Sequence, residues 1–304
     1  MEYPAPDVSA RLTALSDLAL TNLGPPSTES QMMRPHDGLL ILAHRQPSDH
    51  LAQVYDPVVC LVLQGAKETG TADSSHTIEA GQFLIVTHDM PVVSRITRAS
   101  AGEPYLALIA AIDHGVLADL RQHAPATATP EDHDHHALRV GDADDELVDA
   151  FTRYLRALRT PADAEVLAPL AVREIHYRLL ASPQGQTLRR LTRGDGPAEP
   201  VFRAIRLIRQ DLAAQLSVKS IASHVGLSTS ALHHHFKAVT GTTPIQYQKQ
   251  LRLLEARRLI WSNTLSITGA AHAVGYTSPT QFSREYHRAF GNPPSRDRLA
   301  AAVT

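Results

Sequence analysis

Two similar stretches near the C-terminal end decide the fold of this chain: SVKSIASHVGLSTSALHHHFKAVTG at residues 217–241 and SITGAAHAVGYTSPTQFSREYHRAFG at residues 266–291. Each predicts a short helix, a turn that contains a glycine, and a second helix whose start is marked by a serine. This order is typical of the helix-turn-helix, whose second helix enters a DNA major groove. Because the pattern occurs twice, we expect two DNA-reading units.

Capping and turn residues set the expected ends of these helices. Ser228 and Ser278 precede the two predicted recognition helices, where a side-chain oxygen accepts from a free backbone N–H. Gly226 and Gly275 stand at the turns, where a positive φ costs glycine little. A long helix predicted at 244–261 joins the units. If both recognition helices enter one face of DNA, they should lie roughly 34 Å apart.

The distribution of charge also favours a nucleic-acid-binding module. The whole chain has a net charge of −2, but residues 200–304 hold 13 Lys and Arg against 4 Asp and Glu, a net charge of +9. Residues 1–199 hold 16 against 27, a net charge of −11. A basic C-terminal third attached to an acidic body indicates that these two parts have different partners.

The single cysteine and the apolar pattern predict where the protein works. Cys60 can form no intramolecular disulfide and lies in an apolar run, so we expect a buried thiol in a reducing compartment. The first residues lack the features of a signal peptide, and no apolar run is long enough to cross a membrane. The sequence therefore predicts a soluble, cytoplasmic protein.

The N-terminal part changes from helical to strand periodicity. An amphipathic helix is expected at 8–20, and helices return after about residue 114, with two longer ones at 144–159 and 162–181. Short apolar runs bounded by turn residues predict an antiparallel sandwich or a small barrel, which could hold a ligand. These runs are 38–44, 57–64, 77–78, 82–87, 92–97 and 105–112. The later helices could pack on this structure or could pair two subunits.

A metal enzyme is the main alternative for such a barrel. Its cupin-type site needs a His-x-His pair with a further Glu and His, whereas His44, His50, His76 and His88 are isolated. The segment EDHDHH at 131–136 resembles a metal-binding tract in composition, but we interpret it as an exposed acidic loop. We therefore expect no metal, no cofactor and no catalytic residue.

Helical periodicity selects the side chains that should face DNA. In the first unit Leu232 and Phe236 point inward and His235 flanks the core, whereas in the second unit Phe282 and Tyr286 point inward. Consecutive helical residues point about 100° apart, so three adjacent histidines make a poor metal site. The exposed faces then carry the predicted DNA-binding residues: Ser230, His233, His234, Lys237, Thr280, Gln281, Arg284 and Arg288. Arg284 is the best candidate for a bidentate guanine contact or a phosphate clamp.

These motifs together resemble the AraC/XylS family of transcription regulators. The resemblance is specific over about residues 200–298 and weaker in the N-terminal part. Its C-terminal matches include Ile221-Ala222, Val225-Gly226-Leu227-Ser228, Phe236-Lys237, Arg252-Leu253, Ala256-Arg257, Val274-Gly275-Tyr276 and Gln281-Phe282-Ser283-Arg284. Its N-terminal matches include the runs at 57–67, 81–86, 89–92 and 104–108, and a later run at 167–188.

This resemblance implies an α+β chain of two domains. A cupin-like β-barrel with flanking helices would occupy residues 1–185, as a sensing or dimerisation domain, and a linker would follow at 186–199. An all-α domain with two helix-turn-helix units on a linker helix would occupy 200–304. The implied function is a DNA-binding regulator, an activator that responds to a small-molecule effector, with double-stranded DNA, RNA polymerase and a second copy of the chain as partners.

Two other functions remain open, and one family feature is missing. The chain could be a metal-dependent cupin-like enzyme fused to a DNA-targeting domain, or a constitutive regulator whose N-terminal domain only dimerises. The family usually has an aromatic residue where Asp297 stands, which predicts looser packing of the last helical turn. The first recognition helix also carries three histidines at positions where basic or amide residues are commoner in the family.

Overall fold

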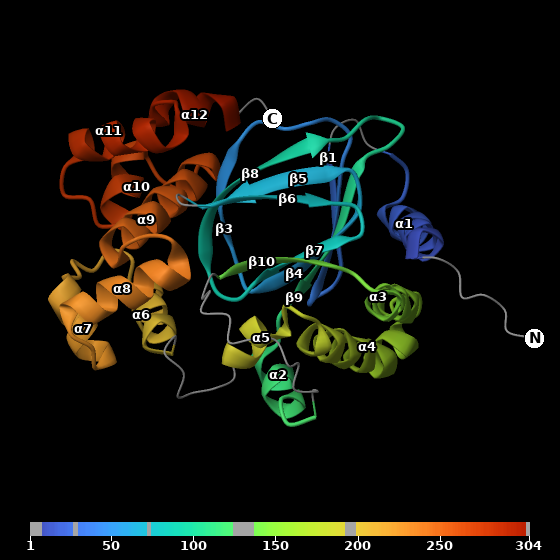
Figure 1. Cartoon of the computed structure of the whole chain (residues 1–304). Coiled ribbons are helices and arrows are strands. Elements are labelled where there is room, and N and C mark those ends of the chain that lie inside the picture. The colour runs from blue at the N-terminus through green and yellow to red at the C-terminus, as the bar shows by residue number, and fades with distance from the viewer. Residues whose placement is uncertain (1–7, 27–29, 72–73, 124–136, 192–198, 302–304) are drawn as a thin grey trace, which may run out of the picture. The chain divides into compact units, whose positions relative to one another are not determined.

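The computed structural model describes residues 8–26, 30–71, 74–123, 137–191 and 199–301. The chain forms two compact units, of which the first holds most of residues 1–196 and the second holds residues 197–304. Figure 1 shows strands and helices in the first unit and helices alone in the second. The α+β fold class with two domains is therefore confirmed, although the closed barrel is not.

The strands of the first unit form two separate sheets rather than a closed ring. The larger sheet has the order β1-β2-β9-β4-β7-β10 and the smaller has the order β3-β8-β5-β6. Pairing between neighbours is antiparallel, as for β4 with β9 and for β5 with β8. The strand bounds are β1 Ser30–His36, β2 Leu39–His44, β3 Leu51–Tyr55, β4 Val58–Gln64, β5 Ala66–Gly70, β6 Ser75–Glu79, β7 Gln82–Val86, β8 Met90–Arg98, β9 Tyr105–Ala111 and β10 Leu138–Asp142.

Strand β4 lies between two apolar cores of the first unit, one on each of its faces. Val59 and Leu61 join the cluster that includes helical side chains, whereas Cys60 and Val62 join the cluster between the two sheets. Both faces of β4 are therefore buried, which is why its sequence is a continuous apolar run instead of an alternating one. The inter-sheet cluster also receives Tyr105 from β9 and apolar residues of β6 and β8.

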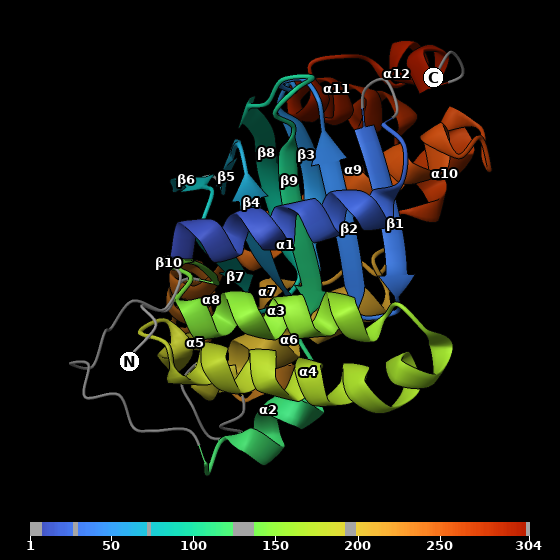
Figure 2. The same ribbon diagram turned by 90° about the vertical axis from the view of Figure 1, so that its right-hand side faces the viewer.

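In the described residues, five helices complete the first unit. They are α1 Val8–Leu23, α2 His114–Leu120, α3 Asp145–Ala157, α4 Pro161–Ala181 and α5 Gly185–Leu191. Helix α1 packs on β1 and β4 of the larger sheet, α3 packs on α1, α4 on α3, and α2 and α5 on α4. Figure 2 shows α1 crossing this sheet, with α3 and α4 running alongside each other. Leu188 of α5 is fully buried in the same core, so the first part of the predicted connector is helical and packed.

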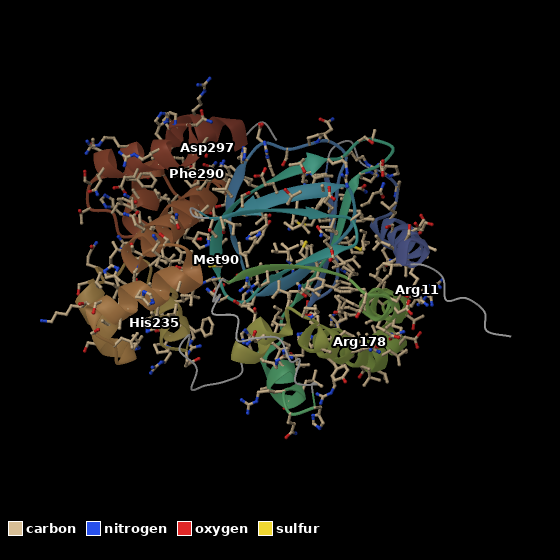
Figure 3. The ribbon with its side chains drawn as sticks, in the orientation of Figure 1. Arg11, Met90, Arg178, His235, Phe290 and Asp297 are labelled. Atoms are coloured by element: carbon tan, nitrogen blue, oxygen red, sulfur yellow. The ribbon has the colours of Figure 1, made fainter. Side chains whose placement is uncertain are left out.

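Polar contacts join the layer of helices. Arg153 of α3 donates two hydrogen bonds to Glu174 of α4, at 2.9 and 2.6 Å. Arg11 of α1, labelled in Figure 3, pairs with Asp149 of α3. His176 is buried and accepts from the Asp113 backbone N–H through Nε2 at 2.8 Å, while its Nδ1 donates to the Val172 carbonyl at 2.7 Å. Burial lowers the pKa of His176, so the ring is neutral at pH 7.

Over residues 199–301, the second unit is built from seven helices: α6 Glu199–Gln210, α7 Val218–Val225, α8 Thr229–Thr240, α9 Pro244–Trp261, α10 Ile267–Ala273, α11 Pro279–Phe290 and α12 Pro294–Ala301. Helices α7 and α8 form the first helix-turn-helix, and α10 and α11 form the second. Helix α9 connects them. None of the helices in the described ranges is both long and apolar enough to span a membrane.

Burial of His88 predicts a loss of stability in acid. Burial lowers the pKa of His88 to about 3, whereas an exposed histidine titrates near 6.5. Below that higher value the unfolded chain binds a proton that the folded chain does not. The free energy of unfolding should therefore fall by about 1.4 kcal/mol per pH unit between about pH 6 and pH 4 because of this group.

Calorimetric unfolding of the full chain at pH 7 and pH 5 measures this loss. His88→Gln should reduce the pH dependence of the melting temperature, because glutamine binds no proton in either state. His114→Gln is the matched control, since His114 is exposed and should leave the pH dependence as in the wild type. Equal pH dependence in all three proteins would contradict the assignment.

Candidate nucleic-acid interface

Hydrogen bonds cap both helices of the first helix-turn-helix and stabilise the turn between them. Ser217 and Ser220 form a reciprocal capping box at the start of α7, with both N–H to Oγ distances at 3.0 Å. Gly226 ends α7 with φ +75°, and the Leu227 N–H then donates to the Ala222 carbonyl at 2.9 Å. Ser228 caps the recognition helix α8, as predicted from its place in the sequence.

The second helix-turn-helix repeats the glycine turn and the serine cap, with one more residue between them. Gly275 has φ +88°, and the Tyr276 N–H donates to the Ala271 carbonyl at 2.9 Å. Ser278 accepts from the Gln281 N–H at 3.2 Å, and Pro279 stands at the first helical position of α11, where a missing N–H costs nothing. The two turns therefore share their glycine and their capping serine but differ in length by one residue.

Each helix-turn-helix has its own apolar core, and α9 contributes side chains to both cores. Tyr247 and Leu251 pack with α6, α7 and α8, whereas Ala256 and Ile260 pack with α10 and α11. Ile245, near the start of α9, is 37% exposed and belongs to neither core.

Hydrogen bonds around Arg252 of α9 fix the two helix-turn-helices relative to each other. Its guanidinium donates to the backbone carbonyls of Leu212, Ala213 and Ala214, at 2.6, 3.2 and 2.9 Å. The Gln248 side chain donates to the Ala214 carbonyl as well, at 2.9 Å. We call these contacts the carbonyl clasp. They hold the loop between α6 and α7, which leads into the first helix-turn-helix, against the connecting helix α9.

The same loop also contacts the turn of the second helix-turn-helix. Gln215 donates to the Gly275 carbonyl at 3.0 Å. A Cβ atom on Gly275 would lie 2.6 Å from the Ala213 carbonyl oxygen, so only glycine permits this approach. Sequence reasoning identified Gly275 as a turn residue and missed that it is a contact between the units. A polar pair at Gln248 and Arg252 on a helix otherwise used for packing is the signal that could have indicated it.

Asp297 strengthens the end of the second unit, which corrects the expectation of looser packing. This carboxylate is buried and accepts from Tyr286 Oη at 2.7 Å and from Arg257 Nε at 3.0 Å. The Arg257 guanidinium also lies over the rings of Trp261, at 4.2 Å, and Phe290, at 4.6 Å. A charged pair with aromatic neighbours thus occupies the place where an aromatic side chain was expected.

The eight predicted DNA-binding residues are exposed on the two recognition helices. Ser230, His233, His234 and Lys237 lie on α8, and Thr280, Gln281, Arg284 and Arg288 lie on α11. His235 is half-buried beside the core. This exposure is what a DNA contact needs, but contact with bases or phosphates stays a prediction for each residue.

A hydrogen-bonded group on α11 orients one of these side chains. Glu285 accepts from Tyr276 Oη at 2.8 Å, from Lys249 Nζ at 2.7 Å and from Gln281 Nε2 at 3.3 Å. Burial raises the pKa of Glu285, but the three donors lower it by more, so the net pKa lies below the ordinary value. The carboxylate is therefore charged and compensated at neutral pH, and its bond to Gln281 holds that amide on the exposed face.

The hypothesis of a metal-dependent enzyme has no support in the described residues. No group of three or more His, Cys, Asp or Glu side chains there could hold a metal ion. The acidic tract at 131–136 lies outside the described residues. The histidines of α8 do not converge on one point either. His234 and His235 meet edge to face, with ring centroids 5.5 Å apart.

A two-sheet domain with a helical layer, followed by two capped helix-turn-helix units, defines a regulator that binds DNA. Family models match both parts. One, described as the AraC-type transcriptional regulator N-terminus, covers residues 35–187, and one described as a helix-turn-helix domain covers residues 221–300. The chain belongs to the AraC family of transcriptional regulators.

Curated relatives match a limited segment. The HTH-type transcriptional activator RhaS of Pectobacterium carotovorum is 36% identical over 94 residues, which are 31% of this chain and 34% of that protein. The HTH-type transcriptional regulator ArgR of Pseudomonas aeruginosa is 32% identical over 104 residues, 34% of this chain and 32% of that protein. The chain thus spans about a third of the length of these relatives.

Solved structures share the fold over most of the chain. An apo ToxT variant from Vibrio cholerae has a TM-score of 0.60 at 12% identity, covering 87% of this chain and 98% of that chain. Wild-type ToxT with a bound unsaturated fatty acid has a TM-score of 0.57 at 12% identity, covering 88% and 97%. At these identities the likeness concerns the fold alone.

The close approach at Gly275 predicts unequal effects of two alanine substitutions. Gly275→Ala and Gly226→Ala both place a Cβ at positive φ, which costs roughly 1–2 kcal/mol. Only Gly275→Ala also forces a Cβ against backbone, since nothing lies within 4 Å of a Cβ at Gly226. Gly275→Ala should therefore lower the free energy of unfolding of the helical unit by more than Gly226→Ala does.

Tryptophan fluorescence during urea unfolding measures both variants. Trp261 of α9 is the only tryptophan of the chain, so its emission reports on the helical unit. Equal losses of stability in the two variants would show that the contact between Gly275 and Ala213 carries no energy.

Proposed function

We propose that this AraC-family protein is a cytoplasmic activator that responds to a small-molecule effector. The first unit would bind the effector between its sheets, and the second would bind a specific DNA site. Effector binding would favour a state of the chain in which both recognition helices can dock, which requires a difference in affinity for the two states. The repeated, capped helix-turn-helix with two exposed faces is the observation that carries the DNA-binding part.

The proposed DNA contacts follow the exposed faces of α8 and α11. His233, His234 and Lys237 would contact base edges or phosphates from α8 of the first helix-turn-helix. Gln281 and Arg284 would do so from α11 of the second helix-turn-helix, with Gln281 oriented by Glu285. Arg284 offers a planar fork that fits guanine in the major groove. Because the two faces differ chemically, one molecule would read two dissimilar half-motifs in an asymmetric site.

Activation and effector binding are supported by relatives and by fold. RhaS is named an activator, and its match with this chain spans 94 residues. Contact with RNA polymerase is the corresponding partner proposal. ToxT, whose fold this chain shares, has been solved with an unsaturated fatty acid, which supports a small-molecule role for the first unit. An enzymatic function is not proposed, because the family consists of transcription regulators.

A second function remains, in which the first unit only dimerises and the regulator is constitutive. Three apolar side chains of α4 support a homodimer. Val166, Leu167 and Leu170 are 64%, 45% and 60% exposed, and they lie within one turn of the helix. An exposed apolar stripe of this kind is typical of an interaction surface. A homodimer is compatible with either function.

Replacing Arg284 tests the DNA-binding assignment. Arg284→Ala should weaken binding to the cognate site by roughly 1–3 kcal/mol, because a bidentate base contact is lost. Gel-shift titration at fixed salt measures the change, with Arg173→Ala as the matched control. Arg173 is an exposed arginine of α4 in the first unit, so its loss removes the same charge away from the recognition helices.

The competitor DNA distinguishes the two roles proposed for Arg284. A base contact predicts reduced affinity for the cognate site with little change for random DNA. A phosphate clamp predicts similar losses on both and a salt slope reduced by about 1. Unchanged affinity of Arg284→Ala for the cognate site would contradict both roles.

A further inference from the structure

Glu285 places a carboxylate on the recognition helix α11, where a negative charge by itself would repel DNA. Its side chain is 16% exposed and accepts from Lys249 Nζ at 2.7 Å, from Tyr276 Oη at 2.8 Å and from Gln281 Nε2 at 3.3 Å. The Lys249 ammonium compensates the charge of Glu285, so the pair has no net charge. Attraction to phosphates therefore does not explain why a carboxylate stands at this position.

The fold of the second helix-turn-helix fixes the position of this carboxylate. Tyr276 is 7% exposed, and its ring meets the buried ring of Phe282 edge to face, with centroids 5.3 Å apart. Lys249 comes from α9, a different helix. An exposed ion pair alone orders its side chains weakly. Here the two shorter hydrogen bonds come from the turn and from α9, so tertiary contacts hold Glu285 in place.

The bond from Gln281 to Glu285 determines which way round the Gln281 amide lies. A charged carboxylate has only acceptors, so it bonds to the amide nitrogen and repels the amide oxygen. One Nε2 hydrogen is used in this bond. Among the described residues nothing else bonds to the amide, and Gln281 is exposed, so Oε1 and the second Nε2 hydrogen remain available. The side chain therefore offers one acceptor and one donor.

One donor beside one acceptor matches adenine better than any other base in the major groove. Adenine presents the N6 amino group as a donor and N7 as an acceptor, whereas guanine presents acceptors at both N7 and O6. A free glutamine amide could donate both hydrogens to guanine, but Glu285 already accepts one of them. Cytosine presents a donor alone and thymine an acceptor alone, so each satisfies only half of the amide.

We propose that Gln281 and Glu285 together specify an adenine, with Gln281 in contact with the base and Glu285 as the positioning residue. Gln281 Oε1 accepts from adenine N6, and Nε2 donates to adenine N7. This assignment rests on the proposed DNA-binding function of α11 and names the base that this helix selects. Glu285 determines specificity more than affinity, because without it the amide is free to rotate toward guanine.

Selection from random DNA tests the proposal without a known site. The full chain would be mixed with duplexes that carry a random core longer than two turns of DNA, and the bound sequences would be read. The wild type should select an A·T pair at one position where Gln281→Ala has no preference. Competition between duplexes that differ only at this position should show that the wild type prefers A·T over G·C roughly tenfold or more.

A double-mutant cycle separates positioning from folding. Glu285→Ala should lower the preference for A·T at this position to about threefold or less and leave the other positions unchanged, because only the amide orientation is lost. In a Gln281→Ala chain, Glu285→Ala should have no further effect on selectivity. Glu255→Ala is the matched control, since Glu255 is a half-buried carboxylate of α9 that pairs with Arg258, and it should keep the wild-type preference.

Each outcome decides the proposal. It is overturned if no selected position depends on Gln281, if that position selects a pair other than A·T, or if Glu285→Ala keeps the full preference. Equal losses of selectivity at every position would make Glu285 a structural residue and overturn it as well. In all these cases the chain still selects a site, so the DNA-binding function stands. A wild-type chain that selects no sequence would overturn that function and this proposal with it.

Discussion

The hydrogen bonds from Arg252 to three backbone carbonyls are the constraint on which the DNA-binding unit depends. Carbonyls at a loop between helices need donors, and this loop obtains them from a side chain on the connecting helix. Burial lowers the pKa of Arg252, yet a guanidinium remains charged, so these bonds are charge-assisted. With the loop fixed on α9, the first helix-turn-helix cannot rotate independently of α9, which leads to the second helix-turn-helix.

Gly275 completes this arrangement from the other side. Its positive φ forms the turn, and because it has no side chain, the second helix-turn-helix can approach the same loop. One residue thus satisfies a local requirement and a contact between units. Two helix-turn-helix units joined in this way act as one body, and the spacing of their recognition helices is set by the protein rather than by the DNA.

The sequence predicted the helical unit better than the sheets, for physical reasons. Capping serines, prolines and turn glycines act locally, so Ser228, Ser278 and Gly226 revealed the helix ends directly. Strands β1, β3, β5 and β10 escaped prediction because polar side chains interrupt their apolar pattern, such as Lys67 and Glu68 in β5. Which strands pair across a sheet depends on tertiary contacts, as for β4 with β9. For the same reason the pattern could not distinguish two facing sheets from a closed barrel.

The site was foreseen as a set of exposed side chains but not as a connected structure. Periodicity placed Arg284 and Gln281 on the outer face of α11, whereas the bond of Gln281 to Glu285 and the clasp around Arg252 depend on tertiary contacts. Asp297 shows the same limit, since its partners Tyr286 and Arg257 lie on two other helices.

Changing the spacing of the DNA half-motifs tests the central claim, that the two units form one rigid reader. Dissociation constants would be measured on the cognate site and on sites with two extra base pairs between the half-motifs. A rigid reader predicts that the wild type loses most of its affinity for the longer site, whereas Arg252→Ala discriminates less between the two sites. Equal affinity of the wild type for both sites would contradict the account.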